Sequence, residues 1–179
     1  MKPIATVALM LNLGVAGVYA QQQPVKMTAS GTIAATTINL QPNTNADEQN
    51  LAGNGTLGTF TFRELHSDPA SPQPSITCSP GNAPPRLYFP NVAGGGVFRF
   101  EDGSLLTVTV TEGVLCVDVD HLVGHLTETY QITGGTGRFK DASGALQSTG
   151  RLKPVLFSAS GAAVLLTNTG ELNGTVRVP

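Results

Sequence analysis

The chain has 179 residues, which is enough for one domain that buries most of its apolar surface, and only 12% of the residues are charged. Its 10 basic and 12 acidic side chains give a formal net charge of −2 at pH 7. Because binding to a phosphate backbone needs a clustered basic surface, this composition argues against a nucleic-acid partner.

The first residues have the pattern of a signal segment. Lys2 precedes an apolar run at residues 4–18, and Ala20 supplies a small residue at the end of the segment. A structural helix is the alternative, but the run is shorter than the roughly 20 residues that cross a bilayer, and the polar sequence QQQP follows directly. We expect residues 1–20 to be a removed signal peptide, a mature domain at residues 21–179, no membrane span, and a secreted or periplasmic location.

Strands rather than helices are predicted for the rest of the chain. The sequence has 21 glycines and 12 prolines, many Thr and Val residues, and no long segment with the 3.6-residue apolar period of a helix. The predicted strands are residues 27–38, 56–64, 86–89, 124–133, 145–152 and 171–178, besides those between residues 96 and 132. The prediction is an all-β domain of eight or nine antiparallel strands, and a closed eight-stranded β-barrel would leave no edge unpaired. A β-sandwich stays open as the alternative, because periodicity does not distinguish closure from stacking.

Two acidic residue–glycine pairs divide residues 96–132 into hairpins. Asp102-Gly103 and Glu112-Gly113 each separate two strand-like runs, as the two-residue turn of a hairpin does. With two-residue turns, the two faces of these strands separate. The predicted core face carries Val97, Arg99, Leu106, Val108, Val110, Leu115, Val117 and Val119. The predicted outer face carries Phe98, Phe100, Thr107, Thr109, Thr111, Cys116, Asp118 and Asp120.

Cys78 and Cys116 are the two cysteines of the chain, and such a pair in an exported protein is expected to form a disulfide. A zinc site would need more ligands than two cysteines supply. Cys116 is predicted to point outward, so the segment with Cys78 would lie across the outside of the sheet. That segment, residues 67–85, is rich in Pro and Ser and would cover Phe98 and Phe100. A disordered linker is the alternative for this segment.

The sequence YQITGGTGRFKDASGALQSTG, residues 130–150, is the most specific motif in the chain. It resembles the loop and following strand of the allene oxide cyclase-like and dirigent-like barrel proteins, in which a strand ends in GGTGxF or GGSGxF and the chain re-enters the sheet after a short helical turn. The resemblance implies an eight-stranded antiparallel barrel with a small-molecule cavity. Plant members of the group cyclise an unsaturated fatty-acid epoxide or direct the coupling of phenoxy radicals. The match carries over no catalytic residue.

The loop of this motif has expected structural roles. Its residues are Gly134, Gly135, Gly137, Arg138 and Phe139. Glycines permit backbone angles that are closed to other residues, and Thr136 can cap a single turn. Phe139 can close the barrel end, which leaves Arg138 to bond exposed carbonyl groups. A nucleotide site is not expected, because the GxGxxG spacing and a βαβ setting are missing.

Glu128 is the candidate catalytic residue, as a general acid or base. It alternates with Leu126 and Tyr130 and is therefore predicted to point into the barrel, where burial without a partner would raise its pKa. Arg99 and Tyr130, on the predicted core face, are the candidate ligand-binding residues. A water-exposed position at the barrel mouth and a salt bridge to Arg99 are the alternatives for Glu128.

Neither a metal site nor a cofactor is expected. Two aspartates and two histidines cluster at a predicted hairpin: Asp118, Asp120, His121 and His125. His121 falls on the opposite face or in the turn, so a polar loop is the favoured interpretation. His66 is isolated and is predicted to lie on the surface. The GxSxG elbow of a hydrolase is absent from the sequence.

The sequence therefore predicts an exported barrel that binds a small apolar or aromatic molecule or acts as an interaction module. A cyclase or isomerase that positions its substrate inside the barrel is the alternative. Copies of the chain are a further candidate partner, through Phe98 and Phe100 on the predicted outer face. Sequons at Asn54 and Asn173 would carry glycans only in a host that glycosylates exported proteins.

Overall fold

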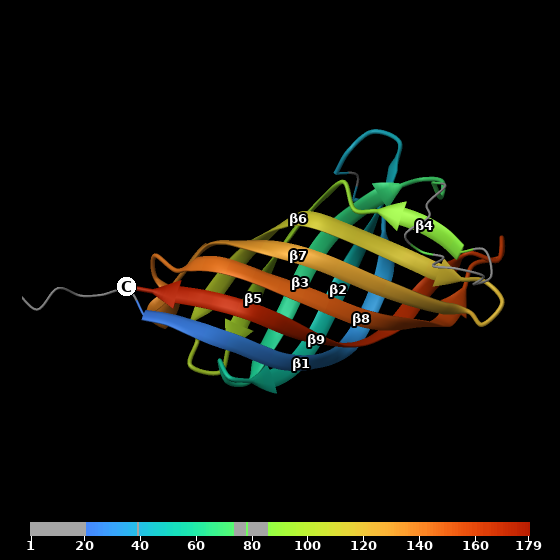
Figure 1. Cartoon of the computed structure of the whole chain (residues 1–179). Helices are drawn as coiled ribbons and strands as arrows, with labels where there is room; N and C mark the ends of the chain where they lie inside the picture. The colour runs from blue at the N-terminus through green and yellow to red at the C-terminus, as the bar shows by residue number, and fades with distance from the viewer. Residues whose placement is uncertain (1–20, 39, 74–77, 79–85) are drawn as a thin grey trace, which may run out of the picture.

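Nine strands and one short 3-10 helix form most of the chain in the computed structural model, which describes residues 21–38, 40–73, 78 and 86–179 (Figure 1). The strands are β1 (Gln21–Thr36), β2 (Thr44–Gly55), β3 (Phe60–Pro69), β4 (Arg86–Pro90), β5 (Ala93–Phe100), β6 (Leu105–Asp118), β7 (Val123–Gly135), β8 (Ser143–Phe157) and β9 (Ala163–Val178). The helix, η1 (Gly137–Phe139), lies between β7 and β8. The predicted signal segment falls outside the described residues.

Eight of the strands close into an antiparallel barrel. Around the ring the order is β6-β5-β3-β2-β1-β9-β8-β7, and the pairing of β7 with β6 completes the closure. Closure gives the backbone of each strand a partner on both sides, which an open sheet cannot do at its edges. The predicted all-β barrel is confirmed, and the sandwich alternative is wrong for the described strands.

The remaining strand, β4, extends the hairpin that β5 makes with β6. Arg86 pairs with Asp118 at one end of this hairpin and Arg99 pairs with Leu105 at the other, so both strands keep one register along β6. A break at residues 91–92 separates β4 from β5, opposite an irregularity of β6 between Val110 and Glu112. β4 therefore lies beside the C-terminal part of β6, residues 114–118, as an extra strand at one end of the barrel (Figure 1).

The hairpin between β5 and β6 differs from the prediction by one residue. Its loop has three residues, because the backbone N–H of Phe100 donates to the carbonyl of Ser104 and Gly103 adopts φ +80°. A positive φ at glycine is typical of three-residue hairpin loops. A slip of one residue turns every side chain of a strand to the other face. Phe98 and Phe100 are consequently buried inside the barrel, and Val97 and Arg99 are exposed outside it.

This correction removes four earlier interpretations. Phe98 and Phe100 cannot form an outer docking face, and the Cys78 segment cannot cover them, since both rings are interior. Arg99 is not on the core face, so neither its salt bridge to Glu128 nor its role as an interior ligand-binding residue stands. Self-association of the chain stays a prediction, without the surface expected for it.

The second predicted turn, at Glu112-Gly113, is wrong. β6 continues through this pair to Asp118, and the chain reverses instead at residues 119–122. The irregularity after Val110 shifts the register, and Leu115 still faces inward, against a small apolar cluster with Leu126. Val119, predicted in the core, is exposed in the turn. An acidic residue before glycine at a bulge thus gives the same local signal as a hairpin turn.

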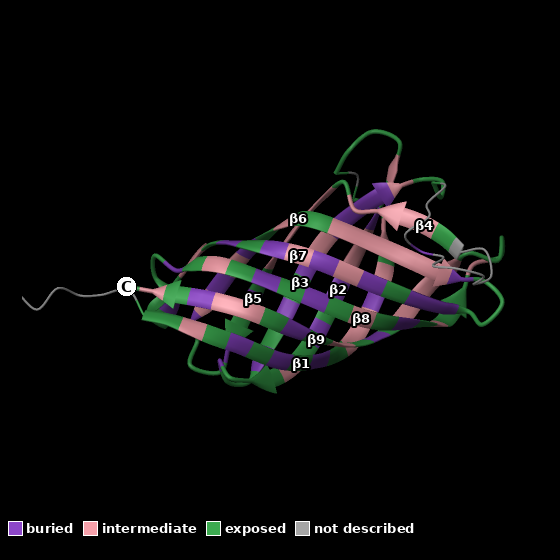
Figure 2. Cartoon of the chain, in the orientation of Figure 1, coloured by how far each residue is buried: buried purple, intermediate pink, exposed green. Residues whose placement is uncertain are grey.

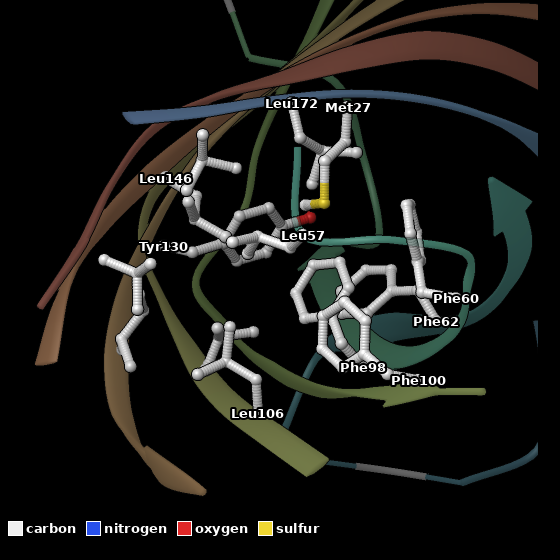
Figure 3. Packing of buried hydrophobic residues seen from close by; sticks show 14 of the residues in the cluster. Met27, Leu57, Phe60, Phe62, Phe98, Phe100, Leu106, Tyr130, Leu146 and Leu172 are labelled. Atoms are coloured by element: carbon white, nitrogen blue, oxygen red, sulfur yellow. The ribbon is translucent and has the colours of Figure 1, made fainter. Parts of the chain in front are cut away.

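Aromatic side chains fill one half of the barrel. Buried and exposed residues alternate along the strands (Figure 2), and the phenylalanines of the neighbouring strands β3 and β5 pack side by side on the inner face of the barrel (Figure 3). The rings of Phe62 and Phe98 stack with their centroids 4.1 Å apart. Gly96 makes this packing feasible, because a Cβ there would lie 2.6 Å from the Phe62 ring. This half of the interior is a packed core.

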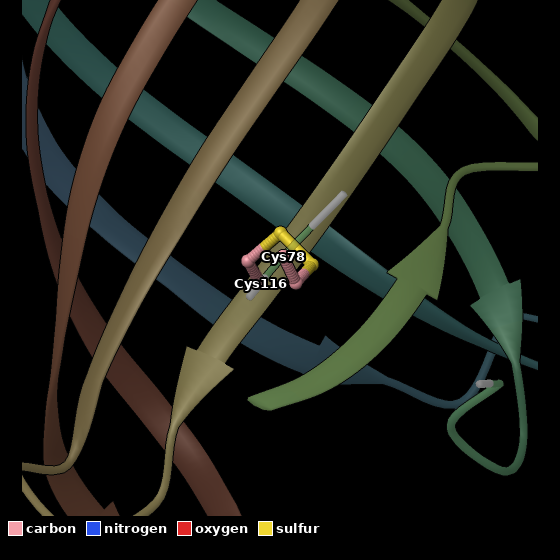
Figure 4. Close-up of a disulfide and its surroundings, with 2 residues drawn as sticks. All are labelled: Cys78 and Cys116. Carbon is pink, nitrogen blue, oxygen red and sulfur yellow. A yellow bond between two sulfur atoms is a disulfide. The ribbon is translucent and has the colours of Figure 1, made fainter. Parts of the chain in front are cut away.

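A disulfide joins Cys78 and Cys116, with a Cα–Cα distance of 5.5 Å (Figure 4). Leu115, the preceding residue of β6, packs toward the interior, which places Cys116 on the outer side of the strand. The bond therefore attaches the segment with Cys78 to the outside of the barrel, as the sequence predicts. Most of that segment, residues 74–77 and 79–85, falls outside the described residues. In the part of the chain that the structure covers, no helix is long and apolar enough to cross a bilayer.

Candidate functional site

Beyond the phenylalanines, the interior of the barrel changes from apolar to polar. On β3 the inward side chains run from Phe60 and Phe62 to Glu64 and His66, and all four are buried. Other strands contribute inward polar side chains at the same level. The polar cluster, as we use the term, consists of Gln49, Glu64, His66, Asn91, Glu128, Tyr130 and Asn168.

Tyr130 connects the two carboxyl groups of the cluster. Its hydroxyl oxygen lies 2.8 Å from Oε2 of Glu64 and 2.6 Å from Oε2 of Glu128. A neutral tyrosine has one hydroxyl proton, so it can donate only one of these hydrogen bonds. The other bond needs a proton on a carboxyl group. The arrangement thus fits one ionised and one protonated carboxyl on either side of the phenol.

The environment assigns that proton to Glu128. Burial, followed by the negative charge of Glu64, raises the pKa of Glu128 to about 8. Burial also acts on Glu64, but its contacts with His66 and with the Tyr130 hydroxyl outweigh it and lower the pKa of Glu64. At neutral pH the pair therefore consists of a neutral Glu128 and an ionised Glu64.

His66 lies inside the barrel, which corrects the prediction of a surface histidine. It is only 3% exposed. Its Nδ1 lies 3.6 Å from Oε1 of Glu64 and 3.8 Å from Oε1 of Glu128. Burial alone would lower the pKa of His66, but the contact with Glu64 and the charges of Glu128 and Asp68 raise it to about 10. The alternation from Phe60 through Phe62 and Glu64 to His66 is the sequence signal that would have placed it inside.

Amides from three other segments hold the two carboxyl groups. Gln49 donates from Nε2 to Oε2 of Glu64 at 2.8 Å, and Asn168 donates to Oε1 of Gln49 at 2.5 Å. Asn91, at the break between β4 and β5, donates from Nδ2 to Oε1 of Glu128 at 2.6 Å. Gly113 makes room for this amide, since a Cβ there would lie 2.5 Å from Nδ2 of Asn91. The break between β4 and β5, opposite the irregularity of β6, therefore brings Asn91 into the cluster.

Several polar atoms of this region are buried and have no hydrogen-bond partner among the described residues. They are Oε1 of Glu64, Nδ1 of His66, Oγ of Ser67, Oδ1 of Asp68, Oδ1 of Asn91 and Oδ1 of Asn168. Native interiors contain few such atoms, because each one loses its hydrogen bonds to water on folding. Their concentration in one part of the barrel distinguishes the polar cluster from the apolar core.

Asp68 and Asp47 extend the charged region next to His66. Burial raises the pKa of Asp68 to about 6, and it also raises the pKa of Asp47. One ligand atom from each of these aspartates and one from His66 lie within 4.8 Å of one another, as do ligand atoms of Glu64, His66 and Glu128. His66 thus belongs to two groups of potential metal ligands.

The loop motif lies at the opposite, apolar end of the barrel. Phe139 of η1 is buried, with its ring centroid 4.7 Å from that of Phe100. Arg138 donates to the carbonyl of Leu57, pairs with Asp102 at 3.3 Å and covers both rings. Gly134 and Gly137 have φ values of 143° and 59°.

The Thr136 side chain does not cap the turn of η1 but accepts a hydrogen bond from the backbone N–H of Leu105. The loop of the motif, residues 134–139, therefore closes the barrel end, whereas Tyr130 at the start of the motif belongs to the polar cluster.

The aspartates and histidines near the β6–β7 turn do not form a metal group in the described part of the chain. The His121 backbone N–H donates to Oδ1 of Asp118, and the His121 ring lies 3.1 Å from the same carboxylate. Asp120 and His125 are exposed. Elsewhere on the outer face, a hollow of about 450 Å³ is lined by residues of β2, β3 and β5, among them Arg63 and Val97.

No family model matches the chain, and no curated protein matches it. Four chains of solved structures do match. One is a pterocarpan synthase dirigent protein, with 12% sequence identity over 94% of this chain and 98% of that chain and a TM-score of 0.29. At this TM-score the likeness carries no argument about this chain.

Proposed function

We propose that the protein binds a small molecule inside the barrel, at the polar cluster, and that this molecule has an apolar or aromatic body and a polar group. The observation that carries the proposal is the set of buried polar atoms without partners at the cluster. Leaving such an atom unpaired costs about 1–3 kcal/mol. A ligand whose polar group pairs with several of them would bind favourably for that reason.

The surroundings of the cluster suit the rest of such a ligand. The edge of the Phe62 ring faces the Tyr130 ring at a centroid distance of 5.8 Å on one side. Leu126 lies two residues before Glu128 on β7, within the small apolar cluster that includes Leu115. Small-molecule sites typically combine apolar walls with a few converging polar groups.

Native mass spectrometry of the protein purified from its host tests this proposal. The expected result is an additional mass that is released on denaturation. The dye 8-anilinonaphthalene-1-sulfonate serves as a second probe, with saturable fluorescence that Asn91→Leu weakens at least about tenfold and that Asn173→Leu, on the exposed face of β9, leaves unchanged. A protein with no bound species and no saturable dye binding would instead support the interaction module.

Catalysis of an isomerisation or cyclisation is the second candidate, favoured by the shared proton at Tyr130. Glu128 would donate its proton to one atom of the substrate while the ionised Glu64 accepts a proton from another, so that the product has the same composition as the substrate.

A search for products of unchanged mass separates the two candidates. An extract of small molecules from the host is incubated with the protein and compared before and after by chromatography and mass spectrometry. An isomerase would convert a component to one of equal mass and different retention, and Glu128→Gln would abolish this while Glu171→Gln, on the outer face of β9, would not. Equal conversion by both variants would exclude Glu128 as the acid.

We also infer that the chain is an exported member of the allene oxide cyclase-like and dirigent-like barrels. The motif at residues 130–150 and the closed eight-stranded architecture support membership, and the Cys78–Cys116 disulfide supports a location outside the reducing cytoplasm. Sequencing the N-terminus of the protein recovered from the host tests the export proposal. It should begin at Gln21, and an N-terminus at Met1 would contradict it.

A further inference from the structure

We propose that Glu64, His66 and Glu128 form a binding site for a divalent metal ion of the zinc type, inside the barrel. β3 supplies Glu64 and His66, which point to the same side because they are two residues apart, and β7 supplies Glu128. One ligand atom of each residue lies within 4.8 Å of those of the other two. The site extends the proposed function by naming an ion at the same cluster.

The two oxygens of each carboxyl group face different neighbours. Oε2 of Glu64 and Oε2 of Glu128 both contact the Tyr130 hydroxyl, and Gln49 also donates to Oε2 of Glu64. The Oε1 atoms are the ones directed toward Nδ1 of His66. Metal ligands in proteins are usually oriented in this way by hydrogen bonds from outer groups. Tyr130 and Gln49 would fill that role, together with Asn91 on Glu128.

Two of the three atoms that would bind the ion make no hydrogen bond within the described part of the chain, and the third, Oε1 of Glu128, accepts one from Asn91. Oε1 of Glu64 and Nδ1 of His66 are buried and make no hydrogen bond among the described residues. Both side chains are more than nine-tenths buried and are directed at each other. Unlike a surface group of acidic residues, this arrangement offers a buried imidazole nitrogen that makes no hydrogen bond to the described residues.

The spacing of these atoms distinguishes an ion from a direct hydrogen bond. A hydrogen bond from the imidazole to a carboxylate would bring the two atoms to about 2.7–2.9 Å. The distances found are 3.6 and 3.8 Å. Two ligands bound to one zinc ion at about 2.1 Å in tetrahedral geometry lie roughly 3.4 Å apart. The separations are thus too long for hydrogen bonds and close to those of ligands that share an ion.

The ligand types indicate the class of ion and leave a position open. Imidazole with carboxylates suits zinc and neighbouring divalent transition metals better than calcium or magnesium, which prefer oxygen alone. Three protein ligands leave the fourth tetrahedral position for a donor atom of a small molecule. Asp47 and Asp68 form an alternative group around the same His66, and the experiment must separate the two groups.

Zinc titration by calorimetry tests the site, with purified protein stripped of metal by a chelator. We expect one ion per chain, and affinity at least about tenfold lower for Glu128→Gln and His66→Asn. His125→Asn and Glu171→Gln, both on the outer face, are the matched controls and should bind as the unmodified protein does. Asp68→Asn should also retain binding. Loss with Asp68→Asn but not with Glu128→Gln would overturn the proposed ligand set, as would equal binding by every variant.

A measurement on the unmodified protein avoids dependence on how the variants fold. The X-ray absorption spectrum of the zinc-bound protein should show one imidazole and otherwise oxygen ligands at about 2.0–2.2 Å. The chain has three histidines and no free cysteine, and loss of binding in His66→Asn identifies which imidazole the spectrum reports. Two imidazoles, or oxygen alone, would overturn the proposal.

The same samples separate this inference from the proposed function. The dye is titrated into the protein with and without zinc. Zinc binding without dye binding or a host-derived ligand would reject the small-molecule proposal and leave the metal site standing. Dye binding without zinc binding would reject the metal site alone.

Discussion

The hydroxyl of Tyr130 lies 2.6 Å from Oε2 of Glu128, two residues earlier on the same strand. Both side chains point into the barrel, and both are fully buried. The phenol also reaches Glu64 on β3, so it connects strands that are not neighbours in the sheet. This contact makes Tyr130 the central residue of the polar cluster.

Removal of the Tyr130 hydroxyl should therefore destabilise the protein. Tyr130→Phe keeps the ring but removes a buried hydrogen-bond partner from both carboxyl groups. We therefore expect the free energy of unfolding to fall by about 1–3 kcal/mol. Urea unfolding at pH 7 measures it. Tyr88→Phe, at a half-buried tyrosine of β4, is the control and should cost less. Equal losses of stability in the two variants would show that the Tyr130 hydroxyl contributes no more than that of Tyr88.

The stability of the metal-free protein should fall as pH rises from about 4.5 toward 8. The folded state keeps the proton on Glu128 up to a pKa of about 8, whereas the unfolded chain releases it near 4.5. The contribution is thus complete below the unfolded pKa and is lost as pH rises through the folded one, with a slope of at most about 1.4 kcal/mol per pH unit. The raised pKa of His66 acts in the same direction, between about 6.5 and 10.

Glu128→Gln isolates the Glu128 part of this dependence. The amide resembles the neutral acid, so the variant should match the unmodified protein near pH 4.5 and lose less stability as pH rises to 8. Unfolding by urea across this range, in the presence of a chelator, gives the slopes. Glu171→Gln should keep the slope of the unmodified protein. An unchanged slope in Glu128→Gln would mean that Glu128 is ionised in the fold throughout.

Truncation of two neighbouring residues of β5 should lower the free energy of unfolding by very different amounts. Phe98 is completely buried between Phe60 and Phe62, and Phe98→Ala should cost about 3–5 kcal/mol. Val97 points outward, and Val97→Ala should change the free energy of unfolding by no more than about 0.5 kcal/mol. Thermal or urea unfolding of both variants checks the register of the hairpin. If the hairpin loop had two residues, Val97 would face the core, and Val97→Ala would cost more than Phe98→Ala.

Loss of the disulfide should destabilise the protein chiefly through the unfolded state. Cys78 and Cys116 are 38 residues apart, and closing a loop of that size contributes about 4 kcal/mol in the chain-entropy model. The double variant Cys78→Ser with Cys116→Ser should show this loss in urea unfolding. Far-ultraviolet circular dichroism should remain that of a β protein, since the bond lies outside the barrel. Loss of the β signal under native conditions would show that the bond is needed for the barrel itself.

Local sequence patterns predicted the strands of this chain better than their partners. The Asp102-Gly103 pair correctly marked a hairpin, but the same kind of pair at Glu112-Gly113 belongs to an irregularity within β6. β2 escaped prediction altogether, because TNADEQNLAGNG is poor in strand-forming residues and acquires its structure from β1 and β3 on either side.

Sequence alone determined the all-β class, the cysteine pair and the inward direction of Glu128, since each follows from short-range alternation, turn residues or composition. The choice between a barrel and a sandwich needed the tertiary structure. The tertiary structure decided which faces of β5 and β6 meet, and therefore that Arg99 lies outside and Phe98 inside. It also decided that Glu64 and His66, more than sixty residues before Glu128, share its surroundings. Strand register and ring closure set these proximities, and both depend on the exact length of loops, which local periodicity does not encode.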